Sequence, residues 1–498
     1  MLALAVTGCS FSREESKLVT IRMPERSADF VGPAIDSFSC YAVQVSGPGL
    51  PFGCPPPLTS PMVPPGQGTV NMRVPGGPAR RIQVIGIDFG AATCPIGLPL
   101  TEYLKQNPSS APTFYLLGEA VTDLFKDSAV TIRSTYNAAS AQPFQLIGCN
   151  GPPRNYFVYS AHPGAGRLSI FRYDPATHAM APVDTSYAHA SLNNPRALAS
   201  GGNGKFLFVA TDSPPAISTF AIDAISGNLT PVTSVGITTA PKYLVANPVL
   251  PVLYTAPQPG STTVTSFGYG SAGSVSPIGT ATFMAAGMSR GLEISRNGQH
   301  LYHADSGNGQ IDHWPVSGGS FGSRDSQAHF DLGPIAVHPT GKFLFAGPEG
   351  VSGTLGTYPL ATDGSIAAGS GAFAAANSES VTVDPGGRFV YVAHQASQIG
   401  AFAVNPTTGA LTAITGSPFP TAMTMISSIT MDPLGTQLFA VDNSGASIRQ
   451  FNQNPLTGEL VLPGGSSGIA ATPAQVTVVG VPKPAISPAP SPSPTPPI

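Results

Sequence analysis

Charged residues are scarce in this chain. Asp, Glu, Lys and Arg make up 10% of the 498 residues, against roughly a quarter of an ordinary soluble domain. The 23 basic and 26 acidic side chains leave a net charge of −3, so no positive field would attract nucleic acid, and we expect no such partner. The hydrophobic fraction is nevertheless 42%. That fraction excludes a chain disordered throughout, because enough apolar surface is available to offset the ordering entropy.

Long apolar runs are also missing. No stretch of 18 or more apolar residues occurs after the N-terminus, so a lipid anchor is the only membrane attachment that we expect. Residues 1–9, MLALAVTGC, resemble a bacterial lipoprotein signal, in which small residues precede a cysteine that is lipidated after cleavage. The match lacks a preceding Lys or Arg, and its apolar run is short. The resemblance implies lipidation of Cys9 and, through Ser10, an outer-membrane location; the alternative is a chance match.

Cysteines are few, and apart from Cys9 they are confined to the N-terminal third of the chain. An even number in an exported protein favours one or two disulfides, although free buried thiols are the alternative. Neither a C-x-x-C pair nor a histidine near these cysteines is present, so we expect no metal and no cofactor. The disulfide candidates, whose pairing the sequence leaves open, are Cys40, Cys54, Cys94 and Cys149.

Glycine (56 residues) and proline (53 residues) are abundant, which favours an all-β chain of short strands joined by tight turns. Residues 10–137 contain six runs with period-two alternation and are predicted to form a smaller β-rich domain, an antiparallel β-sandwich. Residues 138–153 are interpreted as a linker. The six runs are KLVTIRM from Lys17, FSCYAVQV from Phe38, TVNMRV from Thr69, RIQVIGID from Arg81, TFYLLG from Thr113 and SAVTIRSTY from Ser128.

The rest of the chain repeats itself. Seven units follow one plan of strand, tight turn and strand, and each continues with a third strand, a second turn and a fourth strand. Their spacing of roughly 43 to 50 residues is typical of β-propeller blades, so we predict a seven-bladed propeller over residues 154–480. The clearest repeats are RALASGGNGKFLFVATD from Arg196, IAVHPTGKFLFAGPE from Ile335, VTVDPGGRFVYVAHQ from Val381 and ITMDPLGTQLFAVDN from Ile429.

The two ends of this region complement each other. The first unit, RNYFVYSAH from Arg154, lacks an inner strand, whereas the run PAQVTVVG from Pro473 is a strand without a blade. We therefore predict that this last strand completes the first blade and closes the ring. Residues 481–498 are Pro-rich and are predicted to be a disordered tail.

The repeats resemble the lactonase-like propeller family that includes 6-phosphogluconolactonase. The resemblance rests on P-x-G before an aromatic-rich strand, followed by F-x-[ILV]-[DN]-x-x-[ST]-G-x-L, and is clearest in residues 381–414 and 429–462. It implies the propeller fold and, as one alternative, lactone hydrolysis. The family's enzymes carry Pro-His-His where an inner strand begins, and no repeat here keeps both histidines. Catalytic residues are therefore not transferred by motif.

Position in the repeat indicates the site instead. Residues at the start of inner strands and at the end of second strands should emerge on one face, around the central funnel. Charged and titratable residues are found there, although solvated loop positions would explain each of them singly. The ligand-binding candidates are Arg196, Lys242, Arg290, Asp212, Asp305, Glu379 and Asp442. The candidates for catalysis are His162, Glu349 and His394 as base, with Arg196 or Arg290 as the electrostatic partner.

Other motifs are interpreted as structural. His300 and His303 are three residues apart on a predicted strand, so their side chains should point to opposite faces and share no metal. Trp314, the single tryptophan, should pack between blades. The G-x-S-x-G matches at Ser320 and Ser466 fall in turns of the repeat, where no nucleophile elbow can form.

Two functional hypotheses remain. The favoured one is an exported cell-envelope propeller that binds a partner protein, a glycan or a small ligand at its funnel. The alternative is a lactone hydrolase, which would act on a small-molecule lactone. Export argues against a cytosolic sugar-phosphate substrate, and the missing histidine pair argues against direct transfer of the family's activity.

Overall fold

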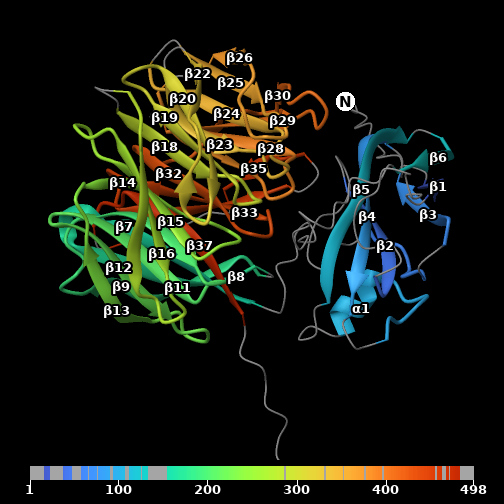
Figure 1. The fold of residues 1–498 in the computed structure, drawn as a ribbon, viewed down its shortest axis with the longest axis horizontal. Coiled ribbons are helices and arrows are strands. Elements are labelled where there is room, and N and C mark those ends of the chain that lie inside the picture. The colour runs from blue at the N-terminus through green and yellow to red at the C-terminus, as the bar shows by residue number, and fades with distance from the viewer. Residues whose placement is uncertain are drawn as a thin grey trace, which may run out of the picture. The chain divides into compact units, whose positions relative to one another are not determined.

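A computed structural model describes most of the chain (Figure 1). The described residues are 16–22, 38–46, 58–64, 67–75, 77–89, 93–106, 112–124, 126–132, 154–175, 177–284, 288–329, 332–350, 353–374, 377–394, 397–454, 457–462, 467–469 and 471–482. They belong to two compact units, one holding β1 to β6 and the other β7 to β37. The predicted linker and residues 483–498 of the predicted Pro-rich tail lie outside the described residues. The first two residues of that predicted tail, Val481 and Pro482, instead belong to a strand, because their backbone pairs with Asn155 and Arg154.

The first unit has two three-stranded sheets, in the orders β3-β1-β6 and β2-β4-β5. Both contribute to one apolar core, in which Val19 and Met72 of the first sheet meet Val43, Val84 and Leu117 of the second. The predicted sandwich is therefore confirmed. The elements are β1 (Ser16–Arg22), β2 (Cys40–Ser46), β3 (Thr69–Pro75), β4 (Gly77–Asp88), α1 (Leu100–Gln106), β5 (Thr113–Leu124) and β6 (Ser128–Thr131).

One strand pair departs from the antiparallel prediction. β6 runs parallel to β1, with Val19 opposite Ser128 and Arg22 opposite Thr131. The alternation of apolar residues determines which side chains face the core, but it carries no information on the direction of a strand that returns from the other sheet. The prediction was wrong at this pair for that reason.

A disulfide joins Cys40 at the start of β2 to Cys94 in the segment before α1, with 6.2 Å between the Cα atoms. It spans 54 residues of sequence and lies beside the core of the sandwich. Two of the four candidate cysteines are thus paired. Cys9, Cys54 and Cys149 lie outside the described residues.

The second unit contains seven sheets among its described residues, and each is a propeller blade of four or five strands. The predicted seven-bladed propeller is confirmed. Blade 1 holds β37 (Gln475–Pro482), β7 (Arg154–His162), β8 (Arg167–Asp174) and β9 (Ala179–Ala188); blade 2 holds β10 (Pro195–Gly201), β11 (Phe206–Asp212), β12 (Pro215–Ile222) and β13 (Leu229–Gly236). Blade 3 holds β14 (Pro241–Ala246), β15 (Val252–Pro257), β16 (Thr263–Tyr269) and β17 (Val275–Thr282).

The remaining blades follow the same order from the inner strand outward. Blade 4 holds β18 (Ser289–Ile294), β19 (His300–Asp305), β20 (Gln310–Ser317), β21 (Ser320–Phe321) and β22 (Asp325–Ala328); blade 5 holds β23 (Leu332–Val337), β24 (Phe343–Pro348), β25 (Thr354–Pro359) and β26 (Ser370–Ala374). Blade 6 holds β27 (Ser378–Val383), β28 (Phe389–His394), β29 (Gln398–Val404), β30 (Leu411–Ala413) and β31 (Phe419–Pro420). Blade 7 holds β32 (Ile426–Met431), β33 (Gln437–Asp442), β34 (Ser447–Gln453), β35 (Leu460–Val461) and β36 (Ser467–Gly468).

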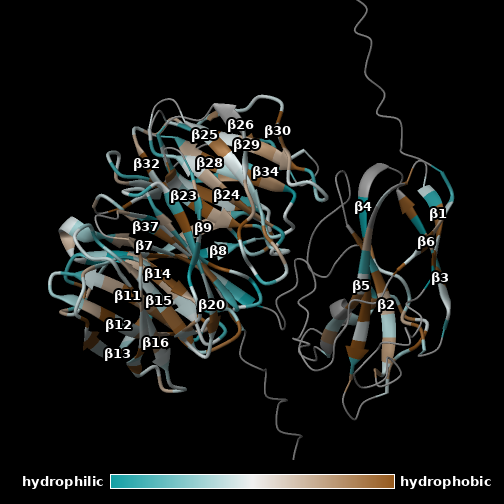
Figure 2. Cartoon of the chain, turned by 45° about the horizontal axis from the view of Figure 1, so that its top comes forward, coloured by the Kyte–Doolittle hydropathy of each residue, from teal (hydrophilic) through white to brown (hydrophobic). Residues whose placement is uncertain are grey.

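The ring closes as predicted. β37 from the end of the chain pairs antiparallel with β7, in continuous register from Gln475 opposite Ala161 to Pro482 opposite Arg154 (Figure 2). Val479 belongs to the apolar cluster shared with blade 2, whereas Val476 belongs to the cluster shared with blade 7. This one strand therefore stabilises both neighbouring interfaces.

The interfaces between blades are apolar. Trp314 of blade 4, which is buried, packs in one cluster with Val252 and Tyr254 of blade 3. Its predicted role in packing between blades is confirmed. Inner strands of successive blades lie against one another around the ring, so residues at equivalent positions on these strands meet at the funnel.

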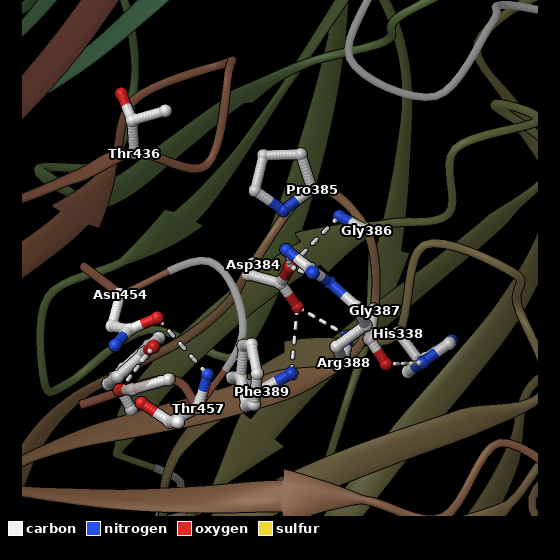
Figure 3. Close-up of polar contacts among 12 residues, drawn as sticks. His338, Asp384, Pro385, Gly386, Gly387, Arg388, Phe389, Thr436, Asn454 and Thr457 are labelled. Carbon is white, nitrogen blue, oxygen red and sulfur yellow. Dashed lines mark hydrogen bonds and ion pairs between the residues drawn. The ribbon is translucent and has the colours of Figure 1, made fainter. Parts of the chain in front are cut away.

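The glycine of the P-x-G turn is required by the packing of neighbouring blades, as blade 6 shows. In blade 6 the Asp384 carboxylate accepts the backbone N–H of Phe389 at 2.7 Å, which holds the turn between the first two strands (Figure 3). Gly387 in this turn has φ +69°, and an added Cβ would lie 2.5 Å from the His338 ring of blade 5. The Gly387 carbonyl lies 2.7 Å from Nε2 of that buried histidine. Glycine is required here both for its backbone conformation and for the close approach of the two blades.

A tyrosine on the second strand of three blades reaches the next blade. Each tyrosine is buried, and its hydroxyl donates to the carbonyl of a glycine in the turn between the third and fourth strands of that neighbour. These contacts add a polar link to an otherwise apolar interface. The three pairs are Tyr159–Gly227 at 2.8 Å, Tyr302–Gly364 at 2.9 Å and Tyr391–Gly458 at 2.9 Å.

We expect Tyr391→Phe and Tyr302→Phe each to lower the free energy of unfolding by about 1 kcal/mol, because a buried carbonyl loses its donor. Urea denaturation followed by far-UV circular dichroism measures this change. Tyr254→Phe is the matched control, since Tyr254 is buried on the second strand of blade 3 and its hydroxyl makes no such hydrogen bond to a glycine carbonyl among the described residues. Equal losses in all three variants would contradict the assigned role of the hydroxyls.

Candidate functional site

Six of the seven inner strands have a β-bulge or a similar register shift near their N-terminal end. In β10, β14, β18, β27 and β32 the register shifts around the second residue, which lies outside the regular ladder. In β23 the shift covers Gly333 and Pro334, whereas β37 pairs with β7 without a shift. A bulge re-aims the side chain of its extra residue. The bulged residues are Arg196, Lys242, Arg290, Glu379 and Ser427.

Three bulged residues on successive blades form a cation arc, which we define as Arg196, Lys242 and Arg290. The Lys242 ammonium donates to the carbonyl of Ser289 in blade 4 at 2.8 Å. Burial, with smaller contributions from Arg290 and Arg196, lowers the pKa of Lys242 to about 8, and Glu379 opposes this shift. These four predicted residues therefore lie in one electrostatic field, as their equivalent positions in the repeat implied.

Two of the cations have carboxylate partners. Nε of Arg196 lies 2.8 Å from Oδ2 of Asp212, at the end of the second strand of the same blade. Arg290 pairs with Glu349, which follows the second strand of blade 5, and both side chains are 29% exposed. The Nε atom of Arg290 is buried and has no hydrogen-bond acceptor among the described residues. The Arg290–Glu349 pair thus combines a partly accessible acid and a partly accessible cation across two blades.

Asp305 and Asp442 occupy a different environment, although they too end second strands. Both are buried. Asp442 accepts the backbone N–H groups of Thr424 at 2.9 Å and Met425 at 3.1 Å, and these hydrogen bonds lower its pKa against the opposing effect of burial. Asp305 accepts the backbone N–H of Met288 at 3.2 Å. The two carboxylates hold the loops that enter the inner strands of blades 7 and 4.

The candidate histidines lie in blades 1 and 6, whereas the cation arc belongs to blades 2 to 4. His162 ends β7 in blade 1 and is buried, with Nε2 2.9 Å from Oγ of Ser169. Burial lowers its pKa. His394 ends β28 in blade 6, where it is half-buried and its ring covers the backbone of Gly400.

One titratable residue of the inner strands was not among the residues predicted from the sequence. Glu293 lies three residues beyond Arg290 on β18, and burial raises its pKa to about 8. The sequence did offer a signal for it, because Glu293 is an acidic residue in the otherwise uncharged second half of an inner strand. Burial raises the pKa of Tyr243 on the neighbouring inner strand β14. The charge of Arg290 opposes this shift, and that of Glu379 adds to it.

We expect the stability of the propeller to fall between pH 4.5 and pH 8 through Glu293. The folded protein holds its proton up to about pH 8, whereas the ordinary value is 4.5, so the unfolded chain binds fewer protons over this interval. Glu293→Gln should remove this component and raise the free energy of unfolding at pH 8 by on the order of 1 kcal/mol relative to wild type. Urea midpoints at pH 5 and pH 8 measure it; an unchanged difference between the two pH values in the variant would contradict it.

The remaining histidines of blade 4 make separate contacts. His303 is buried and lies 3.3 Å from Asp312, whereas Nδ1 of His300 lies 3.2 Å from Nε2 of His313. The predicted separation of His300 and His303 is therefore observed. Within the described ranges no cluster of three or more His, Cys, Asp or Glu side chains could hold a metal ion. No helix in the described part of the chain is long and apolar enough to cross a membrane.

Known structures share the propeller at low sequence identity. A candidate 6-phosphogluconolactonase of Bacteroides uniformis is 21% identical and matches with a TM-score of 0.58, over 66% of this chain and 99% of its own. The periplasmic gluconolactonase of Pseudomonas aeruginosa is 18% identical, with a TM-score of 0.57 over 66% and 99%. At these identities the likeness concerns the fold alone. A comparison with curated proteins gave no match.

The family comparison is more specific. The sequence profile described as "Lactonase, 7-bladed beta-propeller" matches residues 151–237, 216–334 and 323–427 in overlapping segments. Together these segments cover more than half of the chain and extend from blade 1 to the start of blade 7. With the seven sheets and the closing strand, this match identifies the chain as a member of the lactonase family of seven-bladed β-propellers.

Proposed function

We propose that the funnel of this propeller binds a small, hydroxylated anion of the sugar-acid or sugar-lactone class. The observation that carries the proposal is the cation arc, in which three bulged residues on successive blades direct positive charge to one place. Of the occupants expected from the sequence, a small ligand fits best, because the charges converge within the ring of inner strands. A partner protein or a glycan would be expected to use a broader surface.

The arrangement supplies complementary groups for such a ligand. Arginine and lysine donate charge-assisted hydrogen bonds to a carboxylate or phosphate, and the Arg290 side chain is partly exposed. Glu349 and Glu379 can accept hydrogen bonds from hydroxyl groups. The names of the structural neighbours, which refer to gluconolactone and its phosphate, support this ligand class for the family.

Lactone hydrolysis is the second candidate, and the Arg290–Glu349 pair favours it. A carboxylate can take a proton from water while the water oxygen attacks the lactone carbonyl, and a neighbouring guanidinium can stabilise the oxyanion. Cleavage of the ring C–O bond then returns the proton to the leaving oxygen. The products are a carboxylic acid, which ionises, and a hydroxyl group. Neither step needs a metal or another cofactor.

Calorimetric titration with gluconate and 6-phosphogluconate tests the binding proposal. Tighter binding of the phosphate is expected, because it adds negative charge opposite the cation arc. Turnover of glucono-δ-lactone, followed with a pH indicator and corrected for spontaneous hydrolysis, tests the second candidate. Binding without turnover supports the binding function alone, whereas no binding of either anion would refute the proposed ligand class.

We also propose that the protein is exported and anchored through Cys9 to the outer membrane. The Cys40–Cys94 disulfide supports export, because disulfides form and persist mainly in oxidising compartments. The Val-Thr-Gly-Cys motif supports the anchor. Metabolic labelling with palmitate in wild type and in Cys9→Ala tests it, and equal labelling of both proteins would refute lipidation at this cysteine.

A further inference from the structure

A cavity of about 260 Å³ opens on the propeller between blades 4 and 5. Blade 4 contributes Ala328 and His329 at the end of its outer strand, and blade 5 contributes residues of β25 and β26. Its lining includes none of the residues of the cation arc. The cavity is therefore separate from the site considered above.

Glycines of two paired strands line much of this cavity. Thr354, Gly356 and Tyr358 alternate along β25 and so share one face of the sheet. Gly371 of β26 pairs with Gly356, which places two residues without Cβ atoms opposite each other. The ladder also shifts register between Leu355 and Gly356, and such an irregularity leaves backbone groups outside the regular pairing. The cavity is therefore lined by glycine backbone together with the side chains of Thr354, Tyr358 and His329.

Two aromatic side chains that contact each other, Tyr358 and His329, line the cavity. The Tyr358 hydroxyl and Nδ1 of His329 are hydrogen-bonded across the two blades, with 5.5 Å between ring centroids. Both side chains are buried. A Cβ on Gly356 would lie 2.9 Å from each of these rings, so glycine is needed for the rings to pack against this strand. The two rings are thus held in place by each other and by the strand, without a ligand.

The chemistry of the lining selects a class of ligand. Among the residues that the structure describes, the lining contains no Asp, Glu, Lys or Arg side chain, so a charged ligand would lose its hydration to them without gaining an ion pair. It offers the Thr354 hydroxyl, backbone N–H and carbonyl groups, and an aromatic ring edge. Small-molecule pockets usually begin at about 300 Å³, so a single small ring is the largest fitting occupant. We propose that this cavity binds one neutral monosaccharide unit, independently of the funnel.

Saturation-transfer NMR with methyl β-D-glucopyranoside and methyl β-D-galactopyranoside tests the proposal on the full chain. Ala328 is exposed at the rim, where Ala328→Phe should fill the cavity without disturbing the core. Ala188→Phe is the matched control, because Ala188 is exposed and ends the outer strand β9 of blade 1 opposite Arg167, as Ala328 ends the outer strand β22 of blade 4 opposite Gln310. Thr354→Val removes one hydroxyl and keeps the shape.

We expect wild type, Ala188→Phe and the funnel variant Arg290→Ala to transfer saturation to at least one glycoside. Ala328→Phe should reduce the signal at least tenfold, and Thr354→Val should weaken it severalfold. Three outcomes would overturn the proposal: no transfer to either glycoside from wild type, an undiminished signal in Ala328→Phe, or an equal loss in Ala188→Phe. Loss of the signal in Arg290→Ala alone would assign sugar binding to the funnel and would equally overturn it.

Discussion

Replacing Arg290 by alanine should weaken the binding of 6-phosphogluconate by about 10- to 100-fold, the loss expected when one hydrogen bond to a charged group disappears. Two effects add in this variant. The ligand loses a partly exposed guanidinium, and Glu349, which Arg290 neutralises in the native protein, is left as an unpaired negative charge. Calorimetric titration at constant ionic strength measures the change in affinity.

Glu349→Gln separates the two effects, because it removes the negative charge and keeps the size of the side chain. Affinity for the anion should stay the same or rise, whereas any turnover of glucono-δ-lactone should be lost. Arg324→Ala is the matched control: Arg324 is also 29% exposed and also pairs with an acid, but that acid is Asp312 of its own blade. Equal weakening in Arg290→Ala and Arg324→Ala would show that the funnel cation has no specific role.

Deleting β37 should be the most destabilising change in the propeller. Truncation after Ala474 removes eight registered residue pairs with β7 and the buried side chains of Val476, Val479 and Val481. Burial of a valine contributes about 1.5 kcal/mol or more, so these three alone account for on the order of 5 kcal/mol, which is comparable with the whole stability of many domains. The truncated protein should be largely unfolded or melt far below wild type.

Thermal melting by circular dichroism and limited proteolysis measure this effect. A chain ending at Pro482 is the control, since it keeps all of β37. Adding a synthetic peptide of residues 473–482 should partly restore the fold, because the missing strand is recognised by the exposed edge of β7. Unchanged melting of the shorter chain would contradict the role assigned to ring closure.

Much of the propeller could be predicted because the repeat encodes it locally. Each P-x-G turn carries its own requirement for glycine, and Gly387 illustrates how that requirement recurs at the contact between blades. The unmatched strand at the end of the chain predicted closure, since a first blade without an inner strand would leave an open edge. Strand direction in the first unit was not predictable in this way, because the parallel pairing of β6 with β1 depends on the path between two sheets.

The candidate site was predictable in its strands but not in its contacts. Equivalent positions in the repeat brought Arg196, Lys242, Arg290 and Glu379 into one electrostatic field. The same reasoning could not separate Glu349, which pairs with a cation of another blade, from Asp442, which is buried under its own loop. Both end second strands, and only the conformation of the following loop decides whether the carboxylate meets a side chain or the backbone.

The bulges of the inner strands have a consequence for how this family can diversify. A residue that stands outside the ladder contributes no backbone pairing, so its replacement leaves the register of the blade and the closure of the ring unchanged. Arginine, lysine, glutamate, serine and a Gly-Pro pair already occupy this one position in different blades. The bulged residues at the funnel can accordingly be replaced one blade at a time. New ligand specificity can then arise by single substitutions while the fold of the propeller is kept.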